Sequence, residues 1–490
     1  MTAGFAAVLA RYETVIGLEV HCQLLTRSKL FCGCPNRFGA PPNTLVCEVC
    51  LGLPGSLPVL NRHAVTLAIR ASLALGCRVH ATSVFERKNY FYPDLPKGYQ
   101  ISQYQAPLAT HGSLEIAGAD GPRSVRIARL HMEEDAGKLL HEGFAWSDEK
   151  SGVDLNRAGV PLVEIVTEPD LRSPEEAHAY LTALRAVLLY AGISDGNMEE
   201  GSLRCDANVS VRPRGASALG TRAEVKNLNS FRNVARAIEH ELTRQVALVE
   251  SGHEIVQETR LWNDGRGETA PMRSKEDAHD YRYFPEPDLR PLAVSAEWLA
   301  EVRASLPELP AARRKRFVSE YALPDYDAGV LTQERALADY FEEAARASGN
   351  AKAASNWIMT ELLRKLKEDA RPLAEAPVAP SALASLVKLV GAGAISGKIA
   401  KDVFERMWAT GEAPSAIVAR EGLAQLDDEG VLASAVAEVV AASPEQVASY
   451  RGGKAAALGW FVGRVMQRTA GRANPQRVNA LLRKALGGDS

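Results

Sequence analysis

The sequence predicts an α+β protein in which a β-rich domain is followed by two all-α domains. At 490 residues the chain exceeds what one hydrophobic core usually organises, so two or three domains are expected. Short apolar and alternating runs separated by Gly, Pro and Asn turns fill residues 1–292. Ala, Leu, Glu and Arg at helical spacing fill the rest, and a Pro-rich break and a Gly/Ala turn divide that part into a helical domain and a helical tail, at 293–405 and 406–490.

Composition excludes several classes of protein. The hydrophobic fraction of 46% and the charged fraction of 24% are those of a globular protein. No run approaches the ~18 unbroken apolar residues that a membrane span needs. No basic region precedes the short apolar run at the start of the chain, which argues against a secretory signal. We therefore expect a cytoplasmic protein with no membrane partner.

Charge is distributed unevenly along the chain. A net charge of −3 does not by itself indicate nucleic acid, because binding to phosphates needs a local cluster of Lys and Arg. Residues 451–490 provide one, since they hold a single acid, Asp489, and eight basic side chains: Arg451, Lys454, Arg464, Arg468, Arg472, Arg477, Arg483 and Lys484. This end of the chain is expected to meet a phosphate backbone.

Two helix starts can be placed within the β-rich part. Ser173 is a candidate N-cap, Pro174 suits the first turn, and Glu176 would complete a capping box before an apolar periodic run. A second helix is expected to begin at Phe231, directly after the segment EVKNLNS.

Strand alternation gathers polar residues on one face in three segments. In the first segment Glu19 and His21 are two residues apart, so they share a face and could hold a divalent cation together. An exposed polar face or a hydrogen bond at a strand end is the alternative, because two residues do not define a site.

The second segment, RIARLHMEEDAGK, is expected to place apolar residues toward the core and polar residues opposite, with Ala128, Leu130 and Met132 against Arg129, His131 and Glu133. Glu134 and Asp135 follow, so three acids gather at one strand end. Like charges at this spacing repel unless a cation or basic partner neutralises them. Metal binding and a solvated acidic face are equal alternatives here.

The third segment, LRCDANVSV, has the same pattern, with a polar face made of Arg204, Asp206, Asn208 and Ser210. Three such strands could line one cavity. Lys226 and Asn227 come just before the helix expected at Phe231, where an ammonium group and a helix N-terminus could meet a phosphate. Carboxylate-held Mg²⁺ and a Lys are the groups that phosphoryl transfer requires, because the protein's task there is to position and neutralise phosphate charge.

No standard ATP-binding motif accompanies these residues. The segment GAGAISGK ends in Gly-Lys, but Ala392 stands where a P-loop needs its first Gly. Ile399 stands where its Mg²⁺-binding Ser or Thr should be. We interpret the segment as a turn between two helices.

Four of the seven cysteines fall within one short segment, as Cys32, Cys34, Cys47 and Cys50. This spacing predicts a structural Zn²⁺ site, tetrahedral with four thiolates and without an open position for a substrate. Incidental free thiols are the alternative. The other cysteines lie among apolar neighbours and are predicted to be small core residues: Cys22, Cys77 and Cys205.

Motifs along the whole chain carry one resemblance. They are YETVIGLEVHCQL, the two cysteine pairs, RKNYFYPDLPKGYQISQY, LHMEEDAGK, DLNRAGVPLVEIVTEPD, the run from GSLRCDANVS to EVKNLNS, DYRYFPEPDL, LPDYDAGVLT, SNWIMTELL and ISGKIAK. Together they resemble the B-subunit family of heterotrimeric glutamyl/aspartyl-tRNA amidotransferases.

That resemblance implies a fold, an activity and partners. The implied fold is a cradle-like catalytic domain, a helical domain and a tail domain that docks the tRNA body. The implied activity uses ATP and Mg²⁺ to phosphorylate the side-chain carboxylate of misacylated Glu-tRNA(Gln), Asp-tRNA(Asn) or both, after which ammonia attacks the acyl phosphate. The implied partners are the A and C subunits of such a complex. The larger of them is an amidase that would release the ammonia, because this chain lacks the Ser-Ser-Lys set of an amidase.

The resemblance also implies site residues. The cation ligands would be Glu19, His21, Glu133, Glu134 and Asp206, of which the first four are the expected catalytic residues. Contacts to the nucleotide or to the aminoacylated tRNA end would come from Lys88, Asn89, Tyr90, Tyr92, Lys97 and Tyr99, with Lys226 and Asn227. Tyr and Lys suit stacking on a terminal adenine and contact with its phosphates. Zinc would support the cradle rather than the reaction.

Two alternative functions are considered. The archaeal-type component of a two-chain, tRNA(Gln)-specific amidotransferase carries an extra domain between cradle and helical region, whereas here DYRYFPEPDL leads directly into the helical part. A non-catalytic, zinc-containing RNA-binding protein would explain the cysteines and the basic tail. It would leave three acid-rich strand faces unexplained.

Overall fold

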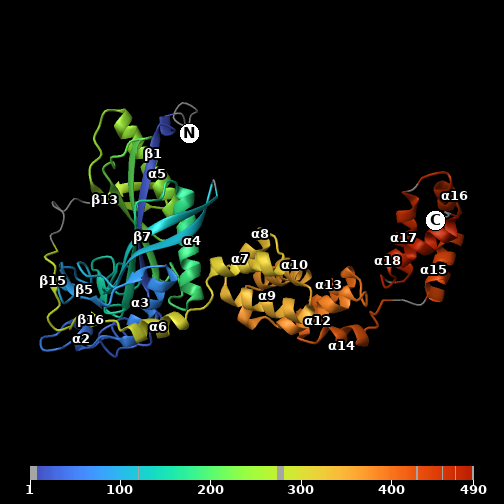
Figure 1. Ribbon diagram of the computed structural model, residues 1–490, viewed down its shortest axis with the longest axis horizontal. Helices are drawn as coiled ribbons and strands as arrows, with labels where there is room; N and C mark the ends of the chain where they lie inside the picture. The colour runs from blue at the N-terminus through green and yellow to red at the C-terminus, as the bar shows by residue number, and fades with distance from the viewer. Residues whose placement is uncertain are drawn as a thin grey trace. The chain divides into compact units, whose positions relative to one another are not determined.

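The structure is a computed structural model that describes residues 8–119, 121–272, 281–425, 429–454, 456–469 and 471–487. It divides into two compact units, Met1–Ala311 and Ala312–Ser490, and Figure 1 labels many of their elements. The first unit is β-rich with helices and the second is helical, so the expected α+β class is confirmed. Asp489 and the first seven residues, where the apolar N-terminal run begins, lie outside the described residues.

A nine-stranded sheet is the frame of the first unit within the described residues. From edge to edge its strands are β14 (Glu268–Pro271), β13 (Glu258–Asn263), β12 (Ala223–Leu228), β11 (Leu203–Pro213), β1 (Tyr12–Gln23), β10 (Pro161–Thr167), β7 (Gly121–Glu134), β6 (Ala109–Gly118) and β2 (Arg78–Val79). Only β12 and β13 pair in parallel among these strands. Because β1 lies between strands from distant parts of the chain, any site on this sheet is assembled across the sequence.

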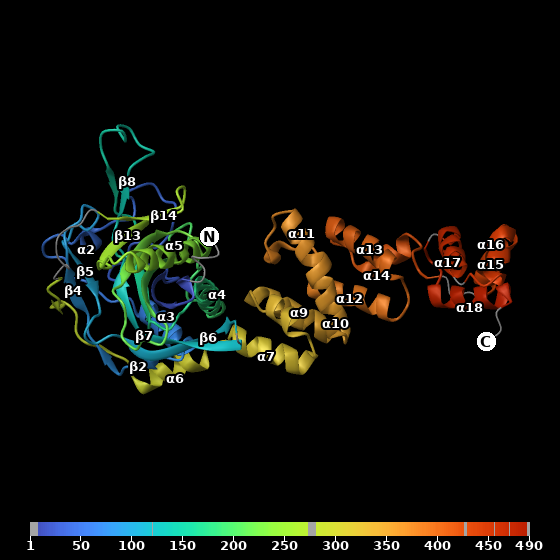
Figure 2. The ribbon, with the colours of Figure 1, turned by 90° about the horizontal axis from the view of Figure 1, so that it is seen from above.

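Smaller elements surround the sheet. Three minor sheets pair β15 (Phe284–Pro285) with β4 (Glu86–Asn89) and β5 (Tyr99–Ser102), β16 (Leu292–Ala293) with β3 (Thr82–Ser83), and β8 (Lys138–Leu140) with β9 (Gly152–Asp154). The β8–β9 hairpin extends away from the rest of the unit (Figure 2). The helices are α2 (Glu48–Leu51), α3 (Arg62–Ala74), α4 (Pro174–Tyr190), α5 (Phe231–Glu250) and α6 (Ala296–Ala304).

One face of the sheet is apolar and the other is polar. In β1, Leu18 and Val20 are fully buried and alternate with Glu19 and His21, as the strand period requires. Apolar residues of α3, α4 and α5 belong to the same core as those of the strands. That core also contains the three isolated cysteines, which confirms their prediction as core residues: Cys22, Cys77 and Cys205.

Side-chain caps start the two helices whose beginnings were predicted. The Ser173 hydroxyl accepts from the Glu176 amide at 3.2 Å, and α4 begins at Pro174. The predicted capping box is only half formed, because the Glu176 carboxylate accepts from the amide of Arg172 at 2.8 Å. Helix α5 begins at Phe231, as predicted.

A β-bulge changes the expected faces of β7. The register between β7 and β10 shifts where Thr167 pairs with Ile127, so that Ala128 is passed over. Ile127 consequently lies in the core, whereas Ala128 was predicted to do so and is only half-buried. The expected alternation holds beyond the bulge, where Leu130 and Met132 are fully buried.

The second unit is formed by short helices. They are α7 (Pro310–Tyr321), α8 (Asp325–Leu331), α9 (Arg335–Ser348), α10 (Ala351–Trp357), the π-helix η1 (Ile358–Leu362), α11 (Leu363–Glu368), the 3-10 helix η2 (Leu373–Glu375), α12 (Pro380–Gly391), α13 (Gly397–Thr410), α14 (Pro414–Arg420), α15 (Glu429–Ala441), α16 (Pro444–Arg451), α17 (Ala457–Arg468) and α18 (Pro475–Leu486). Residues 392–396 connect α12 to α13, which agrees with the interpretation of GAGAISGK as a turn between helices.

The packing differs from the predicted domain boundaries. The boundary expected at 292/293 precedes α6, but Val302 of α6 packs into the core of the sheet, so the first unit continues to Ala311. The boundary expected at 405/406 falls inside α13, whose residues share a core with α14. A separate core joins α15, α17 and α18. The change in sequence texture marks where helices begin, not where one core ends.

No single helix in the described part of the chain has the length and apolar composition to cross a membrane. One bent pair, α15 and α16, meets that test of length and composition when taken together, with an angle of 92° between its helices.

Candidate functional site

Neighbouring strands align three polar residues in a row across the polar face of the sheet. His21 of β1 is opposite Glu164 of β10, and Glu164 is in turn opposite His131 of β7. Glu133 lies two residues beyond His131 and so shares its face. The two carboxylates and two imidazoles therefore form one cluster.

Each imidazole faces both carboxylates. His21 Nε2 lies 3.5 Å from Glu133 Oε1 and 3.6 Å from Glu164 Oε2. His131 Nε2 lies 3.3 Å from Glu164 Oε2 and 3.8 Å from Glu133 Oε2. His131 is buried and its Nδ1 has no hydrogen-bond partner among the described residues, whereas 21% of the His21 side chain remains exposed. The cluster is thus reached from solvent through His21.

Burial and mutual attraction oppose each other in this cluster. Burial disfavours the charged imidazoles, but the facing carboxylates outweigh it and raise the pKa of His21, and they raise the pKa of His131 to about 9. Burial likewise disfavours the charged carboxylates, yet the imidazoles hold the pKa of Glu133 and of Glu164 below the usual range. Both carboxylates are therefore ionised, as cation ligands must be, whereas His21 must be in its neutral form to bind a cation.

The cluster has the dimensions of a cation site. One ligand atom each from His21, Glu133 and Glu164 lie within 4.8 Å of one another. Ligands around a six-coordinate cation with bonds of about 2.1 Å are about 3 Å apart when adjacent and about 4.2 Å apart when opposite, so the separations in the cluster are of the size that such a cation requires. Imidazole and carboxylate ligands with open positions toward solvent leave room for substrate oxygens.

A second polar group lies in the next row of the same face. Asn208 Nδ2 donates to Glu19 Oε1 at 2.9 Å, and Asp206 is opposite Glu19 in the register. Lys226 Nζ lies 3.2 Å from Asp206 and 3.1 Å from Glu224. Burial and nearby carboxylates raise the pKa of Glu19, even though Asn208 opposes this. Glu19 thus lies in a partly buried position close to other carboxylates.

The structure separates Glu134 from the other predicted cation ligands. It follows Glu133 in β7, so it points to the opposite face. There it forms a buried ion pair with Lys97 and accepts from the amide of Ile101 at 3.0 Å. Lys97, expected near the nucleotide, is consequently turned away from the cluster. The prediction gave too much weight to adjacency in the sequence.

Asp135 is neutralised by basic side chains. Arg204 lies 3.0 Å from its carboxylate and Arg157 lies 3.5 Å away. Gln23 Nε2 also donates to it at 3.0 Å. The three acids predicted at one strand end therefore have three different surroundings, and only Glu133 belongs to the histidine cluster.

A wall of tyrosines, formed by Tyr90, Tyr104, Tyr281 and Tyr283, lies near the histidine–carboxylate cluster. The rings of Tyr90 and Tyr281 form a T-shaped, edge-to-face pair with centroids 6.1 Å apart, and Tyr281 meets Tyr283 in the same way. Tyr283 stacks on Tyr104 with centroids 4.5 Å apart. Lys88 Nζ lies 4.7 Å from the Tyr281 ring centroid. Burial, followed by the charge of Glu133, raises the pKa of Tyr90, which indicates that this wall borders the cluster.

Other predicted contact residues hold the backbone or lie apart. The Asn89 amide group donates to the carbonyls of Tyr281 and Arg282, which fixes the tyrosine wall beside β4. Asn227 donates to the Trp262 carbonyl at 3.0 Å and adopts a φ of 65°. Tyr99 lies against the Arg87 guanidinium at 4.1 Å, and Tyr92 is exposed.

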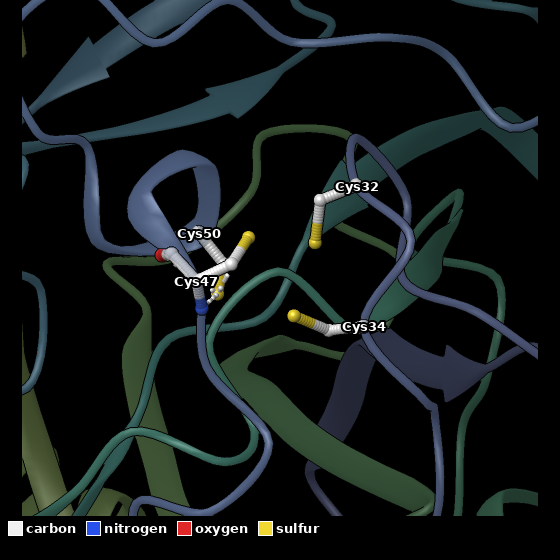
Figure 3. Close-up of side chains that lie close together, drawn as sticks. All are labelled: Cys32, Cys34, Cys47 and Cys50. Carbon is white, nitrogen blue, oxygen red and sulfur yellow. Dashed lines mark hydrogen bonds between the residues drawn. The ribbon is translucent and has the colours of Figure 1, made fainter.

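The four clustered cysteines converge on one point (Figure 3). Their Sγ atoms all lie within 4.8 Å of one another, and those of Cys47 and Cys50 are 3.9 Å apart. Thiolates around tetrahedral zinc with bonds of about 2.3 Å are roughly 3.8 Å apart, so the cluster fits such an ion. Hydrogen bonding from Cys32 lowers the pKa of Cys50 to about 4, with the charge of Lys29 contributing.

Two glycines allow close packing around the cysteine centre. Gly52 ends α2 with a φ of 68°, and a Cβ there would lie only 2.1 Å from Lys97 Cγ. Gly159 has a φ of 83°, and a Cβ there would lie 3.3 Å from Cys50 Cβ. A cavity of about 200 Å³ lies between the cysteine centre and the pair of Lys97 with Glu134.

Sequence reasoning missed several members of these groups. Glu164 was not singled out, although it is the one charged residue in the apolar strand PLVEIVT. His131 was placed on the polar face but given no role. Tyr281 and Tyr283 stand in a motif used only for the resemblance, and their proximity to Tyr90 depends on tertiary structure.

Seven of the eight basic residues counted in the C-terminal segment are exposed, and Arg472 is half-buried. Arg468 pairs with Glu438 on α15. Arg451 donates to the Leu486 carbonyl at 3.3 Å. The exposed guanidinium and ammonium groups lie on or next to α16, α17 and α18.

Comparison with known proteins assigns the family. The model of the GatB/GatE catalytic domain matches residues 14–300, and that of the GatB domain matches residues 339–486. The chain belongs to the GatB/GatE family. The B subunit of the aspartyl/glutamyl-tRNA(Asn/Gln) amidotransferase of Carboxydothermus hydrogenoformans is 55% identical over 98% of this chain and 99% of its own length. The protein of the same name from Geobacter sulfurreducens is 56% identical over 97% of this chain and its full length.

Both candidate centres of this GatB/GatE family member, the sheet cluster and the cysteine centre, lie within the part matched by the catalytic-domain model. The eight basic residues of the C-terminal segment all lie within the part matched by the GatB domain. The resemblance drawn from the motifs is thereby confirmed.

Proposed function

We propose that this chain is the B subunit of a tRNA-dependent amidotransferase and carries the site where the misacylated side chain is activated. The substrate would be Glu-tRNA(Gln), Asp-tRNA(Asn) or both, as the names of the relatives state for those proteins. The observation that carries the proposal is the cluster of His21, Glu133 and Glu164 on the polar face of a family-matched catalytic domain. Glutamine-derived ammonia would come from the A subunit, which is the amidase. The small C subunit would complete the complex.

The histidine–carboxylate cluster would hold Mg²⁺. When bound, this ion supplies positive charge against the phosphates of ATP. Glu19 with Asp206 and Asn208 would bind a second cation or water ligands of the first, because these three side chains lie together in the next row of the polar face. The fit supports a cation on this face, and Glu134 is left out of it because it is paired with Lys97.

The reaction would proceed in two balanced steps. A side-chain carboxylate oxygen of the misacylated residue attacks the γ-phosphorus of ATP, and ADP leaves. Ammonia then attacks the carbonyl carbon of the acyl phosphate, phosphate leaves, and the nitrogen loses a proton as the amide forms. This chain would orient the reactants and neutralise their charge, with Lys88 and Lys226 as the cationic side chains on or near the polar face.

The tyrosine wall would receive a planar base. Tyr281 and Tyr283 present rings near the acidic cluster, and Lys88 adds a positive charge beside them. Rings of this kind stack on adenine, which occurs both in ATP and at the end of a tRNA acceptor strand. Their position supports binding of an adenosine next to the cation.

The cysteine centre and the C-terminal helices would support the reaction without taking part in it. The cysteine centre would hold structural Zn²⁺ and stabilise the loops of residues 32–50 without taking part in the reaction. Exposed Lys and Arg of the C-terminal helices would contact the tRNA backbone. Amidation of tRNA serves translation, so the proposal places the protein in the cytoplasm.

The two alternative functions receive less support. A non-catalytic RNA-binding protein does not account for the match to a catalytic domain over residues 14–300. The archaeal-type form requires an inserted domain, but the chain aligns with B subunits over 97–98% of its length and 99–100% of theirs.

ATP hydrolysis by the reconstituted heterotrimer tests the proposal. Misacylated tRNA is expected to stimulate hydrolysis in the wild type, and Glu133→Gln is expected to abolish the stimulation. Glu254→Gln, which changes an exposed carboxylate after α5, serves as the matched control and should retain it. Binding of tRNA without any stimulated hydrolysis in the wild type would overturn the proposal.

A further inference from the structure

Lys29 is a fully buried lysine beside the cysteine centre. Its residue has 0% exposure, so its amine cannot reach water by extending along the surface. Lys29 Nζ donates to the Leu45 carbonyl at 2.7 Å and to Cys50 Sγ at 3.6 Å. Within the described residues, no carboxylate oxygen lies within 4.0 Å of this amine.

The surroundings of Lys29 hold it in place. Its backbone amide donates to the Cys34 carbonyl at 3.0 Å, and its carbonyl accepts from the Asn61 side chain at 3.2 Å. On the other side, a Cβ on Gly159 would lie 3.5 Å from Lys29 Cδ. The side chain is therefore enclosed between the cysteine loops and the turn at Gly159.

A buried ammonium group is costly unless a negative charge is close to it. The Cys50 sulfur is the group near Lys29 Nζ that can become negative, because the other partner is a neutral carbonyl. Four neutral thiols would leave the ammonium unpaired. Four thiolates around one divalent cation carry two negative charges in excess, and a buried cation beside them offsets part of that charge.

We propose that Lys29 is a fixed counter-charge of the cysteine metal centre, holding the thiolate cluster through Cys50 while the bound metal in turn allows this lysine to be buried. The inference rests on the zinc site of the proposed function but is independent of the amidation reaction. It assigns Lys29 a positioning and charge-balancing role that the motif of four cysteines does not contain.

A double-mutant comparison on the full-length chain, prepared with its amidase and small partner chains, tests this role. Lys29→Met keeps an unbranched side chain of nearly the same length and removes its charge, and Lys29→Arg keeps the charge. Each is made with the native cysteines and with all four replaced, as Cys32→Ser, Cys34→Ser, Cys47→Ser and Cys50→Ser. Lys398→Met, at an exposed position, is the control.

The first readout is zinc content by mass spectrometry and the transfer of zinc to a chromogenic chelator. Lys29→Met is expected to release zinc at least about tenfold faster than the wild type, the scale of outer-shell effects at metal sites. Lys29→Arg should retain more zinc than Lys29→Met, and Lys398→Met should match the wild type. Equal zinc release from wild type and Lys29→Met would overturn the proposal.

The second readout is the melting temperature. With native cysteines Lys29→Met should lower it, whereas in the four-serine background the same change should raise it, because it removes an unpaired buried charge. A decrease in both backgrounds would mean a packing role only and would also overturn the proposal. If Lys29→Met is insoluble with native cysteines, the direction of the change in melting temperature in the four-serine background decides alone. Neither readout uses ATP or tRNA, so failure here is distinct from failure of the proposed function.

Discussion

The two candidate metal centres of the first unit are built in opposite ways. The cysteine centre draws all its ligands from residues 32–50, with the amine of Lys29 enclosed beside it. The sheet cluster draws His21, Glu133 and Glu164 from three strands, and one ligand remains partly exposed. A closed set of thiolates suits a structural ion, whereas an open set of imidazole and carboxylate groups leaves positions for a substrate. The chemical type of the ligands and their exposure to solvent therefore distinguish a structural centre from one that can bind a substrate.

Glu164→Gln is expected to have the largest effect on the open centre. It removes one of the two carboxylates that face both His21 and His131, so tRNA-stimulated ATP hydrolysis should fall by on the order of 100-fold. Steady-state hydrolysis with Glu254→Gln as control measures this. Activity within about threefold of the wild type would contradict the assignment of Glu164 to the cation site, and with it the contrast between the two centres.

His131→Gln should have an intermediate effect. His131 is the buried imidazole of the cluster and is expected to act by orienting Glu164, so the dependence on Mg²⁺ should shift to concentrations about tenfold higher with less change in the maximal rate. Rates measured across a Mg²⁺ series separate the two parameters. His141→Gln changes an exposed histidine of the β8–β9 loop and is the control. An equal loss of rate at every Mg²⁺ concentration would contradict the orienting role.

Cys50→Ser should separate stability from reaction. Loss of the zinc proposed for the cysteine centre is expected to lower the melting temperature by on the order of 5 °C while leaving tRNA-stimulated hydrolysis within about threefold of the wild type at 25 °C. Thermal unfolding and hydrolysis are measured on the same preparation. A loss of activity matching that of Glu164→Gln, without loss of fold, would mean that the closed centre also serves the reaction.

Glu342 in the second unit contrasts with Glu19, because arginines lower the pKa of Glu342 whereas the pKa of Glu19 is raised. Burial disfavours the charge of Glu342, but Arg316 and Arg313 outweigh it and lower its pKa to about 2. A lowered pKa adds stability that is present above the unfolded value near 4.5 and is lost as the pH falls toward 2. Glu342→Gln should therefore destabilise the unit by about 1–2 kcal/mol at pH 7 and by less at pH 3.

Melting curves between pH 3 and pH 7 check this prediction. Glu343→Gln, at the exposed neighbouring acid, should leave the curve unchanged. If Glu342→Gln destabilises the unit equally at every pH, the ion pairs of Glu342 make no pH-dependent contribution to stability.

Much of the local structure follows from the sequence, because its causes are local. Ser173 caps α4 as expected from its position before Pro174, and the spacing of the cysteines predicts their convergence. The period of a strand correctly places Glu19 and His21 on one face. These features depend on a few consecutive residues and on backbone geometry.

The sheet cluster could be predicted only in part, because its assembly is not local. Glu164 meets His21 and His131 through the register of three strands, which the sequence does not encode in any one segment. The bulge at Ala128 shifts one of those registers by a residue. Glu134 shows the opposite error, since adjacency to Glu133 suggested a shared site although neighbouring strand residues point apart.

Binding of Mn²⁺, followed by electron paramagnetic resonance of the full-length chain in complex with its amidase and small partner chains, tests the central claim most directly. If a divalent cation binds to the polar face, the Glu164→Gln variant should lose most of the bound Mn²⁺ and the Cys50→Ser variant should retain it. Equal Mn²⁺ binding by Glu164→Gln and the wild type would contradict the claim that His21, Glu133 and Glu164 form the cation site.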